Sequence, residues 1–173
     1  EDTYEVENEP VFGYLRGRYT KAEMKELNAY ANEWGIELIP CIQTLAHIRN
    51  IFRYSVYDSV RDFGDILLID EPRTYELIEN MFSTLAECFT SRKVHIGMDE
   101  AFMVGLGNYR TKHGICDRYD LLVRHLNKVV EIAKKYNFHP IMWSDMFFRM
   151  SNNGEYYVNK TEIPEDVISK IPD

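Results

Sequence analysis

Apolar side chains follow helical spacing after Thr20 and then form a short continuous run, the pattern of one helix followed by one strand. Thr20 and Glu23 form a capping box that marks the start of the helix, and Gly35 marks its end. The apolar run over 36–42, with Pro40 near its end, predicts a strand. The apolar residues at helical spacing, expected to face the core, are Met24, Leu27, Tyr30, Ala31 and Trp34.

The same helix-then-strand pattern occurs twice more along the chain. The predicted elements are helices over 71–89 and 118–136, and strands over 94–100 and 140–145. Asp70 is the expected N-cap of the second helix, with Pro72 in its first turn, and Asp117 is the expected N-cap of the third. The apolar residues 66–69 resemble a strand, but we interpret them as a packed loop inside the long connection that precedes the second helix.

The order of these elements predicts the fold class. Helices that alternate with strands favour an α/β fold with parallel strands and right-handed crossovers. Three strands cannot close a (β/α)8 TIM barrel, which needs eight strands and about 250 residues. We therefore expect residues 1–173 to be an internal fragment, the middle portion only, of a partial (β/α)8 barrel domain. The chain begins with Glu1 rather than Met, which agrees with this interpretation.

Charge and composition exclude several classes of partner. The net charge is −8, the sequence has no dense cluster of Lys and Arg, and no apolar run reaches 18 residues. Nucleic acid and membranes are therefore not expected partners. Three cysteines, an odd number without metal-ligand spacing, favour a reducing compartment and hence a cytoplasmic location. The sequon at 159–161 matters only if the protein is secreted by a eukaryote.

Two adjacent carboxylates, Asp99 and Glu100, stand where the second predicted strand ends. Parallel sheets place their chemistry at the carboxyl ends of strands, so these residues are the candidate centre of an active site. A conventional glycosidase pair flanks the scissile bond with its carboxyl groups at least about 5 Å apart. Neighbouring residues instead reach different parts of one sugar, as substrate-assisted catalysis by a 2-acetamido group requires.

The segment 95–100 reads His-Ile-Gly-Met-Asp-Glu and resembles the His-x-Gly-x-Asp-Glu motif of glycoside hydrolase family 20, the β-N-acetylhexosaminidases. The resemblance extends along most of the chain. Residues 35–40 resemble the helix end and strand that precede the family's Pro-Gly-His segment, and His47 falls where the histidine of that segment lies. Residues 143–145, Trp-Ser-Asp, resemble the family's Trp-containing end of a later strand.

The resemblance implies roles for individual residues. Glu100 resembles the general acid that protonates the leaving oxygen and then acts as base on water. Asp99 resembles the residue that orients the acetamido group and stabilises the oxazoline intermediate. The family is a known exception to the two-carboxylate scheme. Trp143 resembles a wall of the pocket around the N-acetyl methyl group, and His47 and His95 resemble supporting residues.

The resemblance also implies a retaining enzyme that removes terminal GlcNAc or GalNAc from glycans, without cofactor or metal. Asp145 is a candidate substrate-binding residue or a cap for the next segment. Asp2 resembles an acidic partner of His47. One departure from the family pattern is Gln43, which stands where the family has an aspartate. The family's sugar-binding arginine, and its late tyrosine, aspartate and tryptophan, have no counterpart in residues 1–173.

Two rival interpretations remain open. A metal-dependent TIM-barrel hydrolase could use His47, His95, Asp99 and Asp145, all legitimate ligand types. However, the rise of a strand would separate His95 from Asp99 by about 13 Å. Alternatively, the chain is a non-catalytic fragment that forms a homo-oligomer through open barrel edges. Individually, the carboxylates could be an acidic helix start, the histidines could be core residues, and Trp143 could serve packing alone.

Overall fold

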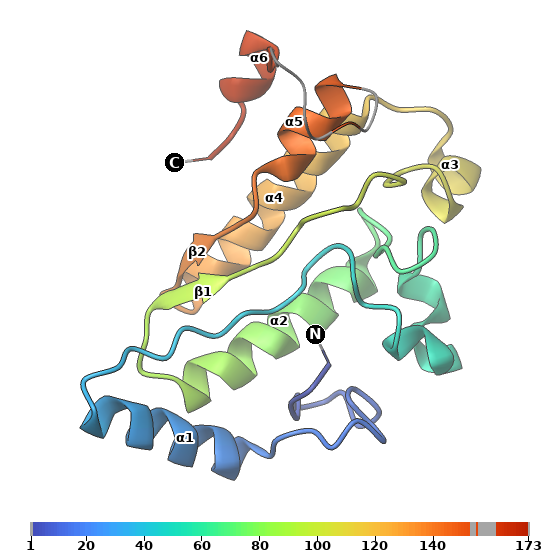
Figure 1. Ribbon diagram of the computed structural model, residues 1–173. Coiled ribbons are helices and arrows are strands. Elements are labelled where there is room, and N and C mark those ends of the chain that lie inside the picture. Colours follow the sequence, from blue (N-terminus) through green and yellow to red (C-terminus); the bar gives the residue numbers. More distant parts are fainter. Residues whose placement is uncertain (1, 153–154, 156–161, 173) are drawn as a thin grey trace.

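The computed structural model describes residues 2–152, 155 and 162–172, so the sequon at 159–161 lies outside the described residues (Figure 1). Helices alternate with two short parallel strands in the order that the sequence predicts. In chain order the elements are α1 (Lys21–Glu33), η1 (Ile51–Arg53), η2 (Ser55–Val60), α2 (Pro72–Cys88), β1 (Lys93–His95), α3 (Asn108–His113), α4 (Arg118–Lys135), β2 (His139–Ile141), α5 (Asp145–Ser151) and α6 (Glu165–Ile168).

The sheet is parallel, but its strands are shorter than predicted. β1 pairs with β2, with Val94 opposite Pro140. The predicted strand over 36–42 contributes only an isolated parallel bridge between Cys41 and His95. With Cys41 opposite His95, Ile39 stands opposite Lys93, the first residue of β1. The residues before Ile39 therefore have no residue of β1 opposite them. The extended segment nevertheless lies beside β1, because the Ile42 amide donates to the His95 carbonyl at 2.8 Å.

The other two predicted strands, over 94–100 and 140–145, also end early. β1 stops at His95, because Gly97 and Met98 have φ angles of +69° and +71° and turn the chain out of the extended conformation. β2 stops at Ile141, because α5 already begins at Asp145. These turns decide where the polar residues at the strand ends point.

Helix starts follow the predicted capping with one correction. In α1 the Glu23 amide donates to Thr20 Oγ1 at 3.2 Å, and the Thr20 amide donates to Glu23 Oε2 at 2.7 Å. The prediction that Asp70 caps α2 is wrong, since Glu71 occupies the N-cap position with extended φ and ψ. Asp70 instead has a φ of +62°, and its carboxylate pairs with basic side chains of α4.

The core lies between the sheet and helices α2 and α4, which contact each other and lie behind the strands in the view of Figure 1. Helix α4 buries apolar residues at helical spacing, among them Leu122, Leu126, Val129, Val130 and Ala133. Residues 66–69 are buried and belong to no strand, which confirms the packed loop. Among the described residues, no helix is long and apolar enough to cross a membrane.

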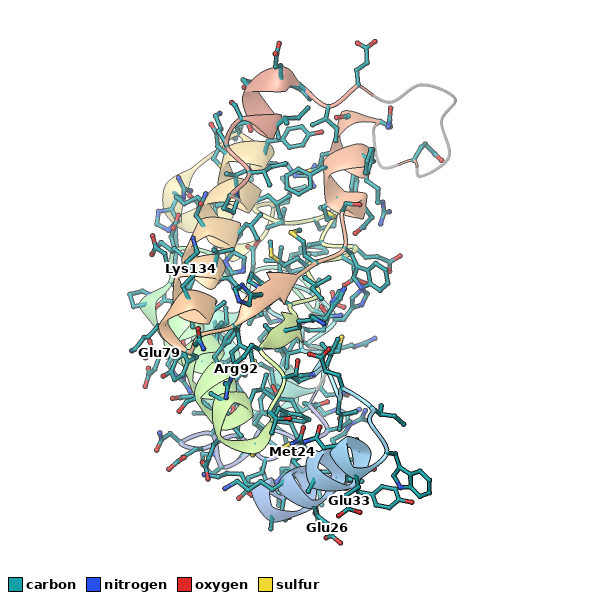
Figure 2. The ribbon with its side chains drawn as sticks, turned by 90° about the vertical axis from the view of Figure 1, so that its left-hand side faces the viewer. Met24, Glu26, Glu33, Glu79, Arg92 and Lys134 are labelled. Atoms are coloured by element: carbon teal, nitrogen blue, oxygen red, sulfur yellow. The ribbon has the colours of Figure 1, made fainter. Side chains whose placement is uncertain are left out.

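Helix α1 departs from the predicted packing. Met24 is buried, whereas Leu27, Tyr30 and Trp34 are 45%, 59% and 69% exposed. Figure 2 shows Met24 pointing from α1 toward the rest of the molecule and Glu26 on the opposite side. The helix packs on α2, and Leu27, Tyr30 and Trp34 remain largely exposed.

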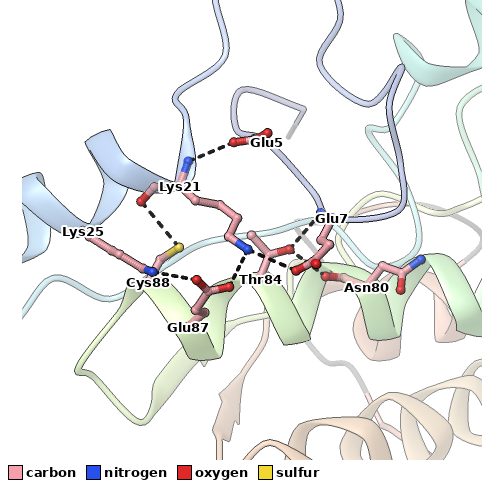
Figure 3. Close-up of polar contacts among 8 residues, drawn as sticks. All are labelled: Glu5, Glu7, Lys21, Lys25, Asn80, Thr84, Glu87 and Cys88. Carbon is pink, nitrogen blue, oxygen red and sulfur yellow. Dashed lines mark hydrogen bonds and ion pairs between the residues drawn. The ribbon is translucent and has the colours of Figure 1, made fainter.

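Ion pairs join α1 to the N-terminal segment and to α2 (Figure 3). Lys21 Nζ lies 3.0 Å from Glu7 Oε2 and 2.5 Å from Glu87 Oε2, and Lys25 Nζ lies 2.6 Å from Glu87 Oε1. Hydrogen bonds to Glu87 and Glu7 raise the pKa of Lys21 above its ordinary value, while its bond to Lys21 lowers the pKa of Glu87. All of these groups are solvent-accessible, so their contribution to stability is small.

Candidate active site

The chain leaves β1 through a tight turn that presents Asp99 and Glu100. Gly97, Met98 and Glu100 all have positive φ angles, of +69°, +71° and +54°. Residues that carry a side chain rarely adopt this backbone conformation, and it persists where surrounding contacts fix it. Met98 supplies one such contact, because its side chain is fully buried. The side chains of Asp99 and Glu100 remain 22% and 49% exposed, so they are available to a ligand.

His47 lies between the two carboxylates. Its Nε2 atom is 3.2 Å from Asp99 Oδ2 and 3.5 Å from Glu100 Oε2, and its Nδ1 atom is 3.8 Å from Asp65 Oδ2. His47 itself has a φ of +59°. The structure therefore brings together three of the residues that the sequence singled out, although they come from separate segments of the chain.

Gln43 contacts the other oxygen of Asp99. Its Nε2 atom donates to Asp99 Oδ1 at 3.2 Å, so the two oxygens of this carboxylate face different partners. Gln43 Oε1 is buried and has no hydrogen-bond partner among the described residues. The amide lies directly over Gly97, where an added Cβ atom would be 2.0 Å from Gln43 Oε1. The glycine in the motif is thus required by close approach as well as by its φ angle.

Trp143 and His95 form an aromatic pair beside the carboxylates. Their ring centroids are 4.9 Å apart, and the Trp143 amide donates to the Gly97 carbonyl at 3.2 Å. His95 Nδ1 accepts from the Gly97 amide at 3.2 Å. His95 therefore contacts the turn and the indole ring, whereas Trp143 is 55% exposed and offers a free aromatic face.

Asp145 accepts the Glu100 amide at 3.1 Å through Oδ2. Ser144 is the N-cap of α5, so the alternative that Asp145 caps this helix is wrong. The residues around it enclose an open pocket of about 420 Å³, lined by Asp99, Glu100, Trp143, Ser144, Asp145 and Phe148. This volume lies within the usual range for small-molecule sites.

Sequence reasoning missed Phe148 and Ser144 in this pocket. Phe148 follows Ser144 by four residues, which is one helical turn in α5. This spacing would have been a usable signal had a helix been predicted directly after the strand, but the sequence predicted none there.

A buried hydrogen-bond chain behind the site was also missed. His125 of α4 is fully buried, and burial lowers its pKa from 6.5 to about 4, so the ring is neutral near pH 7. Its Nε2 atom lies 2.9 Å from the Thr44 carbonyl, which can only accept, so Nε2 carries the proton. Nδ1 then accepts from the Tyr75 hydroxyl at 3.2 Å. Thr44 Oγ1 in turn donates to the Ile96 carbonyl at 2.9 Å, which joins this chain to the strand end.

The geometry does not support the metal-dependent alternative. In the part of the chain that the structure describes, no three His, Cys, Asp or Glu side chains gather as metal ligands do. His95 is directed to Trp143 and the turn, away from the other proposed ligands. Asp2, expected beside His47, lies instead near Arg16 and Asn50, at 3.5 Å from each.

Comparisons with known proteins agree on one family. The model of the glycosyl hydrolase family 20 catalytic domain matches residues 3–164. Human hexosaminidase D is 25% identical over 158 residues, which cover 82% of this chain and 32% of the human protein. A β-hexosaminidase from Vibrio furnissii is 33% identical over 96 residues, 49% of this chain and 16% of that protein. The chain therefore spans about a third or less of these relatives.

Solved structures show the same fold. A chitobiase from Flavobacterium johnsoniae has a TM-score of 0.67 at 21% identity, over 83% of this chain and 25% of that one. A β-N-acetylhexosaminidase from Streptomyces coelicolor has a TM-score of 0.60 at 20% identity, over 98% of this chain and 33% of that one. The prediction of a partial (β/α)8 TIM barrel is thereby confirmed. With its family model matched over most of its length, the chain belongs to glycosyl hydrolase family 20 and carries part of that family's catalytic domain.

Proposed function

We propose that the protein containing this chain is a retaining exo-β-N-acetylhexosaminidase that removes terminal GlcNAc or GalNAc by substrate-assisted catalysis. The observation that carries this proposal is the position of His47 between the adjacent carboxylates Asp99 and Glu100, at the edge of an open pocket walled by Trp143. Relatives described as β-hexosaminidases support the same reaction class.

In the first step Glu100 donates its proton to the glycosidic oxygen while the acetamido oxygen of the substrate forms a bond to C1. The bond from C1 to the leaving group breaks, and an oxazoline forms. Glu100 is the more exposed of the two carboxylates, which leaves it room to reach the oxygen between two sugars. In the second step Glu100 takes a proton from water as the water oxygen attacks C1. The bond from C1 to the acetamido oxygen breaks, which opens the oxazoline ring.

Asp99 orients the acetamido group and stabilises the positive charge that develops on it. Gln43 and His47 each contact one oxygen of this carboxylate, so its plane is fixed before substrate arrives. Preorganised charge aimed at a developing opposite charge is a major source of rate enhancement. Gln43 contributes a neutral donor where a carboxylate would add a second negative charge.

The test replaces Glu100 with Gln and Asp99 with Asn in the full-length protein, and Glu131→Gln serves as a control. Glu131 is an exposed residue of α4 that does not line the pocket. Glu100→Gln should lower kcat about 10²- to 10⁴-fold on a disaccharide, the usual contribution of general acid catalysis. The loss should be much smaller on an aryl glycoside whose leaving group needs no proton.

Asp99→Asn should slow both substrates, because the acetamido group attacks in each reaction, and added chelator should change neither rate. Full activity of Glu100→Gln on the disaccharide would overturn the assignment of the acid. Equal losses on both substrates in that variant would assign Glu100 to binding instead.

A further inference from the structure

Three arginines that are scattered in the sequence meet in one open pocket of about 420 Å³. Arg49, Arg53 and Arg61 line it together with Asn50 and Phe52. They come from η1 and from the loops on either side of η1 and η2. The chain as a whole has a net charge of −8, so this concentration of positive charge runs against its average.

The arginines are available to a ligand. Neither Arg49 nor Arg53 forms an ion pair within the described residues, and both are exposed. Arg61 is held in place, because its Nε atom donates to the Gly64 carbonyl at 2.9 Å and its guanidinium lies 5.3 Å from the centre of the Phe52 ring. Within the described residues these contacts leave its terminal amino groups without a hydrogen-bond partner, so the group is both oriented and free to donate.

Acidic residues of the adjoining loop are engaged elsewhere. Asp62 is buried, and its two carboxylate oxygens accept from the amides of Gly105 at 2.7 Å and Tyr109 at 2.8 Å. Asp65 lies on the His47 side of the loop. The described residues that line the pocket include no carboxylate, so none of them neutralises the arginines.

The pocket shares a loop with the candidate active site. His47 is two residues from Arg49, and the Ile48 amide donates to the Asp65 carbonyl at 3.3 Å. In Figure 1 the segment with η1 and η2 (teal) lies beside α3, on the side toward which the chain leaves β1. A hydrogen bond from Asn108 of α3 to the Arg61 carbonyl, at 2.8 Å, joins these segments.

We propose that this arginine pocket binds a sulfate or phosphate ester carried by a sugar of the glycan substrate, next to the terminal N-acetylhexosamine. The inference rests on the proposed function for the identity of the glycan. Guanidinium groups bind such oxyanions through paired, charge-assisted hydrogen bonds, which an ammonium group does not match. The volume exceeds what a lone ion needs and accommodates part of a sugar ring.

The kinetic test compares two disaccharides with the same terminal GlcNAc, one with a neutral second sugar and one in which that sugar carries a sulfate ester. In the full-length protein, Arg49→Gln combined with Arg53→Gln should lower kcat/KM on the sulfated substrate about tenfold, the scale of one exposed charge-assisted hydrogen bond. The value on the neutral substrate should stay unchanged. The control Arg110→Gln removes an exposed arginine outside the pocket and should alter neither.

A binding test separates this inference from the proposed function. Calorimetry with a sulfated monosaccharide should show binding that the double variant loses and that added salt weakens. If the wild type binds it but hydrolyses neither disaccharide, the proposed function fails and the anion pocket stands. An unchanged preference for the sulfated disaccharide in the double variant overturns the inference. Inorganic sulfate that binds as tightly as the sulfated sugar overturns its carbohydrate part.

Discussion

Acidification should destabilise the protein through one buried residue, His125. Its ring is fully buried and neutral, held by the Thr44 carbonyl on one side and the Tyr75 hydroxyl on the other. Burial lowers its pKa in the folded protein from 6.5 to about 4. Between these two pKa values the unfolded chain binds a proton at His125 that the folded chain does not. The stabilising contribution of the neutral His125 ring is therefore fully present above pH 6.5 and is lost as the pH falls toward 4.

The size of the effect follows from the two pKa values. At pH 7.5 His125 is neutral in both states and contributes no pH dependence. At pH 5 the unfolded ring is almost fully protonated while the folded ring is mostly neutral, because the folded pKa is about 4. The difference amounts to about 2 kcal/mol of unfolding free energy between the two pH values. Carboxylates add their own pH dependence below pH 5, so the comparison is best made at pH 5 and above.

The assay measures urea unfolding at pH 7.5 and pH 5 for the wild type and for His125→Gln, whose amide still donates to the Thr44 carbonyl but does not titrate. The variant should be less stable at pH 7.5, yet lose about 2 kcal/mol less on acidification than the wild type does. His139→Gln, at an exposed histidine, should keep the wild-type pH dependence. Equal pH dependence in His125→Gln and the wild type would refute the reasoning.

Two further substitutions test the turn and the loop that shape the site. Gly97→Ala should lower unfolding stability by about 1–3 kcal/mol and abolish activity, because the φ angle is +69° and the new Cβ would meet Gln43. Gly17→Ala has a similar φ of +63° but open space, so an equal loss there would assign the effect to the backbone alone. Asp62→Asn should lower unfolding stability by about 1–3 kcal/mol, because an amide NH₂ group would replace one of the two oxygens and face the backbone donor of Gly105 or Tyr109. Unchanged hydrogen exchange at residues 105–109 in that variant would contradict this.

Local signals along the chain were enough to predict the three long helices α1, α2 and α4, but not the short helices α3 and α5. A capping box at Thr20 and a capping aspartate at Asp117 each have the hydrogen bonds that their sequence implies. The N-cap at Asp70 was assigned wrongly because an aspartate before a proline-containing turn satisfies the sequence rule equally well. Only the tertiary contact with Arg124 and Lys128 explains why Asp70 takes a left-handed conformation and leaves the cap to Glu71.

Strand lengths and the packing of α1 depend on neighbours, and the sequence therefore predicted them poorly. An apolar run such as 36–42 predicts a strand that pairs along its whole length, but pairing requires an opposing strand in register. The spacing of Leu27, Tyr30 and Trp34 predicts a buried face, but among the described residues no element covers it. The periodicity of apolar residues shows that a helix has an apolar face. It does not show which other element, if any, packs against that face.

The candidate site was predictable where residues are contiguous and missed where they are scattered. Adjacent carboxylates at a strand end are visible in one line of sequence. The Arg49, Arg53 and Arg61 pocket is not, because eleven residues, which include η1 and η2, separate its ends. His125 gave a fainter signal, because it is a polar residue among the buried apolar residues of α4. A polar side chain in such a position normally has a hydrogen-bond partner, but the sequence does not show which residue that partner is.

Three of the seven described non-glycine residues with a positive φ angle lie at the site. His47, Met98 and Glu100 all have positive φ angles within two short segments. Each is fixed by a separate contact, since Met98 is buried, the Glu100 amide donates to Asp145, and His47 contacts both carboxylates. Such conformations cost of order 1–3 kcal/mol each and persist only when the surroundings determine them.

The loop that carries His47 also carries Arg49, so the backbone that positions one positions the other. Its anchor in the core is Thr44, whose carbonyl accepts from His125 and whose hydroxyl donates to Ile96. A rigid anchor, a strained histidine and an uncompensated arginine thus follow one another within six residues. Both proposals therefore depend on the same buried hydrogen bonds, because the loop anchored at Thr44 carries the histidine beside the carboxylates and the arginine of the anion pocket.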